Sequence, residues 1–164
     1  MAQTNTTIAQ TDERTIVITR VFDAPRRLVF QAWTDPRHVA QWWGPPGFDS
    51  PLCEMDLRTG GLFRIHLRAP DGVVHPCRGV FREVIEPERI VYAGEAEEGS
   101  VGCGAGLPPR AVVTVTFTER DGKTTVRIHT LLQSAGDLEA AVQTGFNPGW
   151  AASLDRLADH LRAI

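Results

Sequence analysis

Apolar residues alternate with polar ones along the first part of this chain and later recur every three or four positions. Residues 15–22 (TIVITRVF) alternate and are rich in β-branched side chains, which predicts a strand. Asp23-Ala24-Pro25 ends this strand, and the apolar positions between 29 and 33 then have helical spacing. Asp35-Pro36 ends the first helix and starts a second, which Gly44-Pro45-Pro46-Gly47 terminates. The chain is therefore expected to begin with a strand and two short helices.

From residue 51 onwards the period of two returns and predicts a series of strands. They are expected at about 51–57, 62–69, 73–86, 89–96, 110–120 and 123–133. Pro70-Asp71-Gly72, Glu86-Pro87-Glu88 and Asp121-Gly122 provide turns between some of these strands. Consecutive strands joined by tight turns pair antiparallel, so we expect one antiparallel sheet.

The C-terminal part of the chain has helical spacing again. Ser134 and Asp137 have the spacing of an N-cap and its third helical residue. An apolar stripe follows, comprising Val142, Phe146, Trp150, Leu154, Leu157, Leu161 and Ile164. Asn147-Pro148 interrupts the stripe and leaves two alternatives. Either Asn147 caps a second helix with Pro148 at its first position, or one helix kinks there.

These elements predict an α+β fold, because a lone sheet cannot cover its own apolar face. We expect a curved antiparallel sheet of six to seven strands wrapped around the long C-terminal helix, with two short helices after the first strand. Residues 14–164 are expected to form a single domain. The polar residues 1–13 are expected to be a disordered tail.

Composition narrows the classes of partner. The chain has 164 residues, a net charge of −3 and a pI of about 5.9, which argues against nucleic-acid binding. No apolar run is long enough to span a bilayer, so we expect no membrane association. The three cysteines lack a CxxC pair, which favours free thiols and a cytoplasmic protein. We expect a monomer or a homodimer.

The apolar stripe of the C-terminal helix differs along its length. The distal residues from Leu154 to Ile164 are densely apolar and predict a solid core. Nearer the start of the helix, Phe146 and Trp150 each follow a glycine, and small residues beside large rings leave space. This favours a pocket at that end, with plain core packing as the alternative. Trp42 and Trp43 precede a Gly/Pro loop and are candidates for the apolar border of an opening.

Five segments carry a family resemblance that covers nearly the whole folded part. They are RVFDAPRRLVFQAWTDP at 20–36, QWWGPPGF at 41–48, EMDLRTGGLFR at 54–64, RGVFREVIEPERIVY at 78–92 and TGFNPGWAASLDRLADHL at 144–161. The chain resembles the START-like (SRPBCC) superfamily, and more narrowly the bacterial family of activator of heat shock protein 90 ATPase homologues. The resemblance implies the helix-grip (START-like/Bet v 1-like) fold, with a deep apolar pocket between the C-terminal helix and the sheet.

The pocket hypothesis and the resemblance together give a set of candidate ligand-binding residues. The set comprises Trp33, Trp43, Phe63, His66, Phe81, Glu83, Phe146 and Trp150. We assign no catalytic residue, no metal ligand and no cofactor.

Glu83 is the candidate whose side chain could take the most direct part in binding or catalysis. Strand alternation places Glu83 on the same face as Gly79 and Phe81. On the cavity side it would be a buried carboxylate, or one paired with Arg64 or Arg78, able to orient a ligand or act as a general base. On the outer face of the sheet it would form a structural ion pair, and we keep both alternatives.

His66, His75 and Cys77 invite comparison with a zinc site, because they lie on strands that the turn at residues 70–72 joins. No close pair of CxxC or HxxxH type supports this, so we expect no metal.

The leading hypothesis is non-enzymatic binding of a small hydrophobic molecule. The first alternative is an enzyme similar to polyketide cyclases, dehydratases or hydrolases, which would use a cavity carboxylate or histidine. The second alternative is a co-chaperone-like module whose partner is a chaperone. The three hypotheses differ in whether a polar catalytic group lies in the cavity and in whether a docking surface exists.

Overall fold

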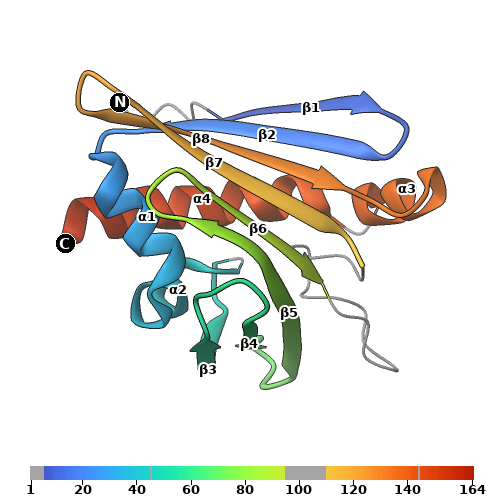
Figure 1. The fold of residues 1–164 in the computed structure, drawn as a ribbon. Helices are drawn as coiled ribbons and strands as arrows, with labels where there is room; N and C mark the ends of the chain where they lie inside the picture. Colours follow the sequence, from blue (N-terminus) through green and yellow to red (C-terminus); the bar gives the residue numbers. More distant parts are fainter. Residues whose placement is uncertain (1–5, 45, 95–109, 144) are drawn as a thin grey trace.

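The computed structural model describes residues 6–44, 46–94, 110–143 and 145–164. Within these residues the chain is α+β, with eight strands and four helices (Figure 1). The strands are β1 (Thr7–Asp12), β2 (Thr15–Phe22), β3 (Asp49–Met55), β4 (Leu62–Arg68), β5 (Val74–Ile85), β6 (Arg89–Gly94), β7 (Val112–Arg120) and β8 (Lys123–Leu131). The helices are α1 (Arg26–Thr34), α2 (Pro36–Trp42), α3 (Ala135–Gln143) and α4 (Phe146–Ala163).

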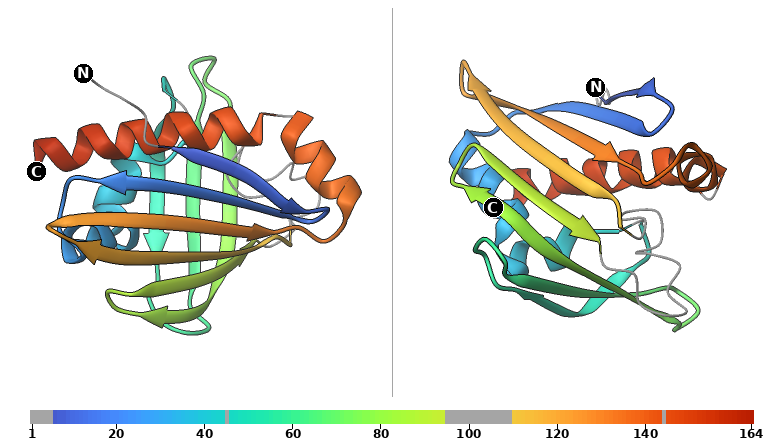
Figure 2. Two further views of the ribbon diagram at one scale, coloured as in Figure 1. Left: turned by 90° about the horizontal axis from the view of Figure 1, so that it is seen from above. Right: turned by 45° about the vertical axis from the view of Figure 1, so that its right-hand side comes forward.

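All strands belong to one open antiparallel sheet in the order β1-β2-β8-β7-β6-β5-β4-β3. The sheet is strongly twisted, so that β3, β4 and β5 run across the direction of β1, β2 and β8 (Figure 2). Helix α4 crosses one face of this curved sheet, and α1 and α2 cover the sheet beside the C-terminal half of α4. This arrangement is the predicted helix grip.

Strand β1 corrects the prediction of a disordered tail at residues 1–13 and of six to seven strands. Thr7–Asp12 form a hairpin with β2, with Ile8 opposite Ile18. Every β1 side chain except that of Ile8 is exposed, so the strand has no apolar alternation to reveal it. Backbone hydrogen bonds to the edge of β2 hold it in place. Residues 1–5 lie outside the described part of the chain.

The C-terminal helical region consists of two helices, which selects the split over the kink. The hydroxyl of Ser134 accepts a hydrogen bond from the Asp137 amide at 3.1 Å, as predicted for the start of α3. The break lies at Gly145, whose φ of 97° is left-handed, and not at Asn147 as proposed. Pro148 therefore falls in the first turn of α4, where its missing N–H breaks no helical hydrogen bond.

The distal half of α4 forms a solid core as expected, except at its end. Leu154 and Leu157 are completely buried, whereas Ile164 is 51% exposed. A buried arginine, Arg20 on the inner face of β2, pairs with the Asp155 carboxylate of α4. Apolar packing and this ion pair fix the position of α4 on the sheet. No helix of the described residues is long and apolar enough to cross a membrane.

Candidate functional site

All four tryptophans of the chain gather in one cluster that joins three helices. Trp33 of α1 stacks on Trp150 of α4, with ring centroids 5.9 Å apart and planes 15° apart. Trp43 packs edge-on against the same Trp150 at 5.3 Å. Trp42 contacts Trp33 at 4.8 Å and donates its indole N–H to the Ala32 carbonyl at 2.9 Å. The cluster fixes α1 and α2 over the sheet.

An apolar cavity lies beside this cluster, between the first two helices and strands β3 to β6. It is lined by Trp33, Trp43, Met55, Phe63, Ile65, Phe81, Ile90 and Tyr92. The volume in which the centre of a water molecule can lie is about 10 Å³, so the cavity has room for about one water. The cavity is therefore nearly filled by its own side chains, in contrast to the deep pocket that the resemblance implied.

Four of the eight candidate ligand-binding residues line this cavity: Trp33, Trp43, Phe63 and Phe81. Phe146 and Trp150 are buried, at 1% and 2% exposed, but do not belong to its lining. Trp150 instead packs behind the two lining tryptophans. The apolar stripe of α4 thus supports the cavity from behind.

A glycine makes room for one side of the cavity. Phe63 on β4 lies directly opposite Gly79 on β5. A Cβ atom at Gly79 would lie 2.3 Å from Phe63 Cζ and 2.6 Å from the Ala93 carbonyl oxygen. The Phe63 ring occupies this space and contacts Phe81 at 5.2 Å and Tyr92 at 5.5 Å.

Glu83 does not face the cavity, because a bulge in β5 follows Phe81. Phe81 pairs with Tyr92 but Glu83 pairs with Val91, so β5 carries one extra residue. The turn between β3 and β4 contacts the strand here: the Gly60 amide donates to the Phe81 carbonyl at 2.7 Å, and the Phe81 amide donates to the Gly61 carbonyl at 2.8 Å.

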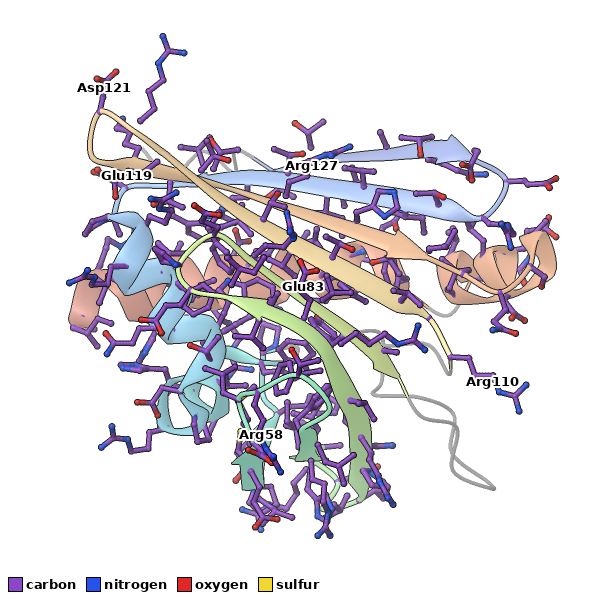
Figure 3. The ribbon with its side chains drawn as sticks, viewed as in Figure 1. Arg58, Glu83, Arg110, Glu119, Asp121 and Arg127 are labelled. Carbon is purple, nitrogen blue, oxygen red and sulfur yellow. The ribbon has the colours of Figure 1, made fainter. Side chains whose placement is uncertain are left out.

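The bulge reverses the faces of the residues that follow it. Val84 packs against the core. The Glu83 side chain, labelled in Figure 3, is half-exposed, and its carboxylate accepts a hydrogen bond from Arg89 Nε at 2.5 Å. The assignment of Glu83 to the cavity is therefore wrong, and the alternative of an outer ion pair holds.

His66 also lies outside the cavity. The buried residues of β4 are Phe63, Ile65 and Leu67, so His66 points to the opposite face of the sheet. There it borders an outer groove together with Arg64.

His66 and the pair of His75 and Cys77 do not form a common site. His66 pairs with Pro76, so strand alternation places it on the face opposite to His75 and Cys77. No group of three potential metal-ligating His, Cys, Asp or Glu side chains occurs in the described part of the chain. Cys77 is disulfide-bonded, which overturns the expectation of three free thiols. Cys53 is free, and Cys103 lies outside the described residues.

Two polar atoms of the cavity lining are buried without a hydrogen-bond partner among the described residues: Trp33 Nε1 and the Tyr92 hydroxyl. Such a group costs about 1–3 kcal/mol relative to a satisfied one. Burial strongly raises the pKa of Tyr92, so its hydroxyl stays protonated. Sequence reasoning missed Tyr92, although it is the only tyrosine and alternates with the buried Ile90.

Arg156 of α4 holds the segment that follows α2. Its guanidinium donates to the Gly44 carbonyl at 2.8 Å and to the Gln41 carbonyl at 3.0 Å. Burial lowers the pKa of Arg156. Because Trp43 lies between these two carbonyls in sequence, Arg156 fixes the backbone from which this cavity side chain projects.

A histidine pair forms a second link between α2 and α4. His38 Nδ1 and His160 Nε2 are 2.8 Å apart, and one of the two nitrogens must donate. Burial, followed by the neighbouring His38, lowers the pKa of His160. The link therefore requires at least one neutral ring.

Solved structures of similar fold cover nearly the whole chain. Ms6760 from Mycobacterium smegmatis is 26% identical, with a TM-score of 0.81 over 96% of this chain and 98% of its own. NE0264 from Nitrosomonas europaea is 22% identical, with a TM-score of 0.81 over 94% and 97%. The AHSA1-like protein from Aeromonas hydrophila is 21% identical, with a TM-score of 0.65 over 90% and 92%. The last two show the fold alone.

The fold and these neighbours are consistent with the START-like (SRPBCC) superfamily, whose fold generally binds ligands. Among curated protein sequences, no relative matches the chain. The family model described as Activator of Hsp90 ATPase homolog 1-like protein matches residues 23–162, and the chain therefore belongs to that family.

Proposed function

We propose that this protein binds a small, largely apolar molecule in the cavity beneath α1 and α2, and that it does so without catalysing a reaction. The supporting observation is the lining itself. Five of its eight residues are aromatic, the other three are Met55, Ile65 and Ile90, and none carries a charge. Concave apolar surfaces with a few polar atoms are typical of small-molecule sites.

The positions of Glu83 and His66 support a binding role over an enzymatic one. The enzymatic alternative required a carboxylate or histidine in the cavity. Glu83 instead pairs with Arg89, and His66 lies on the outer face of β4. Tyr92 is the one titratable group of the lining, and its raised pKa makes it a poor proton donor at neutral pH.

Binding requires side chains to move, because the free space is about 10 Å³. Met55 is the best candidate to move, since it is only partly buried and its unbranched side chain adapts to different shapes. Trp43 follows the last residue of α2, and its displacement would strain the contact of Arg156 with that segment. We therefore expect ligand entry past Met55, with Trp43 as a fixed wall.

A cavity-filling variant tests the proposal. Titration with the uncharged fluorophore N-phenyl-1-naphthylamine should give a saturable rise in emission with the native protein. Ile65→Phe adds volume inside the cavity and should weaken probe binding by about tenfold or more, a loss of about 1.4 kcal/mol. Leu62→Phe is the matched control, because Leu62 lies on the same strand, is 44% exposed and faces outward.

Circular dichroism and a urea melt would establish that both variants are folded, since overpacking costs about 1–3 kcal/mol. Equal probe affinity of folded Ile65→Phe and native protein would show that the ligand site lies elsewhere. Absence of saturable binding to the native protein would contradict the proposal altogether.

A further inference from the structure

The two unpartnered polar atoms of the cavity carry information about the ligand, on the premise that the proposed function is correct. Trp33 and Tyr92 are 2% and 3% exposed, and both line the cavity. Trp33 Nε1 can only donate a hydrogen bond, whereas the Tyr92 hydroxyl can donate and accept. Neither has a partner among the described residues.

Two other buried donors of the core, by contrast, have hydrogen-bond partners. The neighbouring indole of Trp42 is completely buried and donates to the Ala32 carbonyl at 2.9 Å. The buried hydroxyl of Thr124 donates to the Ala24 carbonyl at 2.7 Å. Other buried polar atoms without a partner among the described residues, such as Arg20 Nε and Asn147 Oδ1, lie away from the cavity, whereas Trp33 Nε1 and the Tyr92 hydroxyl belong to its lining.

We propose that the ligand is an uncharged, largely aromatic or aliphatic molecule that carries a hydrogen-bond acceptor, such as a ketone, ester or amide carbonyl. Its acceptor receives the hydrogen bond of Trp33 Nε1, and the Tyr92 hydroxyl provides a second polar contact. A charged ligand does not fit this cavity, because none of its lining residues offers a counter-ion.

A pair of isosteric probes tests this inference. Acetophenone and α-methylstyrene have the same shape, but the carbonyl of the first is replaced by a carbon–carbon double bond in the second. Their dissociation constants are measured by titrating the native protein and following the total tryptophan fluorescence, to which the lining residues Trp33 and Trp43 contribute. The quantity of interest is the ratio of the two constants, because nonspecific apolar effects largely cancel in it.

Tyr92→Phe removes one oxygen atom and leaves the ring contact with Phe63 in place. We expect this variant to lower the preference for acetophenone about 5- to 10-fold while the affinity for α-methylstyrene stays the same or rises. Trp33→Phe should lower the same preference. Trp42→Phe is its matched control and should leave the preference unchanged, since Trp42 does not line the cavity.

Three outcomes would overturn the inference. If both probes bind and their ratio is equal in native protein and Tyr92→Phe, the ligand site has no polar anchor, and the proposed binding function still stands. If Trp42→Phe shifts the ratio as much as Trp33→Phe does, the effect is structural. If neither these probes nor N-phenyl-1-naphthylamine binds the native protein, the proposed function itself fails and the inference fails with it.

Discussion

Replacing Gly79 by alanine tests the packing that shapes the cavity. The added Cβ would lie 2.3 Å from Phe63 Cζ and 2.6 Å from the Ala93 carbonyl oxygen. An ordinary carbon contact is about 3.5–4.0 Å, so both neighbours would have to withdraw by about 1 Å. The Phe63 ring borders a cavity with only about 10 Å³ of free space, and the Ala93 carbonyl belongs to the adjacent strand β6.

The size of the effect follows from two opposing contributions. Overpacking a close-packed interior costs about 1–3 kcal/mol. Replacing glycine by alanine also reduces the conformational entropy of the unfolded chain, which stabilises the folded state by about 0.4–1 kcal/mol. We therefore expect Gly79→Ala to lower the free energy of unfolding by about 1–2 kcal/mol and to weaken probe binding, because Phe63 is pushed into the cavity.

Urea denaturation with linear extrapolation measures the change. The matched control is Gly136→Ala in α3, where the new Cβ would meet only Ser134 Oγ at 3.8 Å. Relief from glycine in a helix should stabilise this control by about 0.5–1 kcal/mol. A second variant, Gly79→Ala combined with Phe63→Leu, should be less destabilised than the sum of its parts, because the smaller side chain removes one clash. Native-like stability of Gly79→Ala would refute this account of the β4–β5 packing.

Three further predictions concern α4 and the outer face of the sheet. Leu157→Ala should lower the free energy of unfolding by about 2–5 kcal/mol in a denaturant melt, because Leu157 is completely buried; a neutral effect would contradict the distal core. The pKa of His160 is lowered in the native state, so its contribution to stability is fully present above pH 6.5 and is lost as the pH falls through the native pKa. In a His160→Gln variant the melting temperature should fall less between pH 7 and pH 5 than in the native protein. An unchanged pH dependence would show that His160 does not cause the fall. Glu83→Gln should change the free energy of unfolding by less than about 1 kcal/mol, because its ion pair with Arg89 is partly exposed. A larger loss in a denaturant melt would contradict the placement of Glu83 on the outer face.

Local signals predicted most of the element order. The strand predicted at about 62–69 is β4 (Leu62–Arg68), and Asp35-Pro36 separated α1 from α2 as expected. The Asp35 carboxylate caps α2 by accepting from the Arg37 amide at 2.9 Å. Phe63 and His66 lie three positions apart on β4, so alternation places them on opposite faces of the sheet, and selecting both for one cavity went against the pattern. These features depend on neighbours in sequence, which is why the sequence was sufficient for them.

The face of Glu83 could not be read from its own strand. It depends on a bulge at which Phe81 exchanges backbone hydrogen bonds with Gly60 and Gly61, about twenty residues earlier in the chain. Strand β1 was missed for a related reason, because it is held by backbone pairing with β2 and its side chains are mostly exposed. Backbone pairing leaves no trace in the side-chain pattern.

The sequence by itself determined the order of strands and helices from residue 15 onwards and the resemblance to the family, because periodicity and motifs record local geometry. Only the tertiary structure decided which aromatic rings meet. Trp33, Trp43 and Trp150 come from three different helical elements, and Tyr92 joins the lining from β6. A cavity is the space left between elements distant in sequence, so its volume and its two unpartnered polar atoms exist only once those elements have packed.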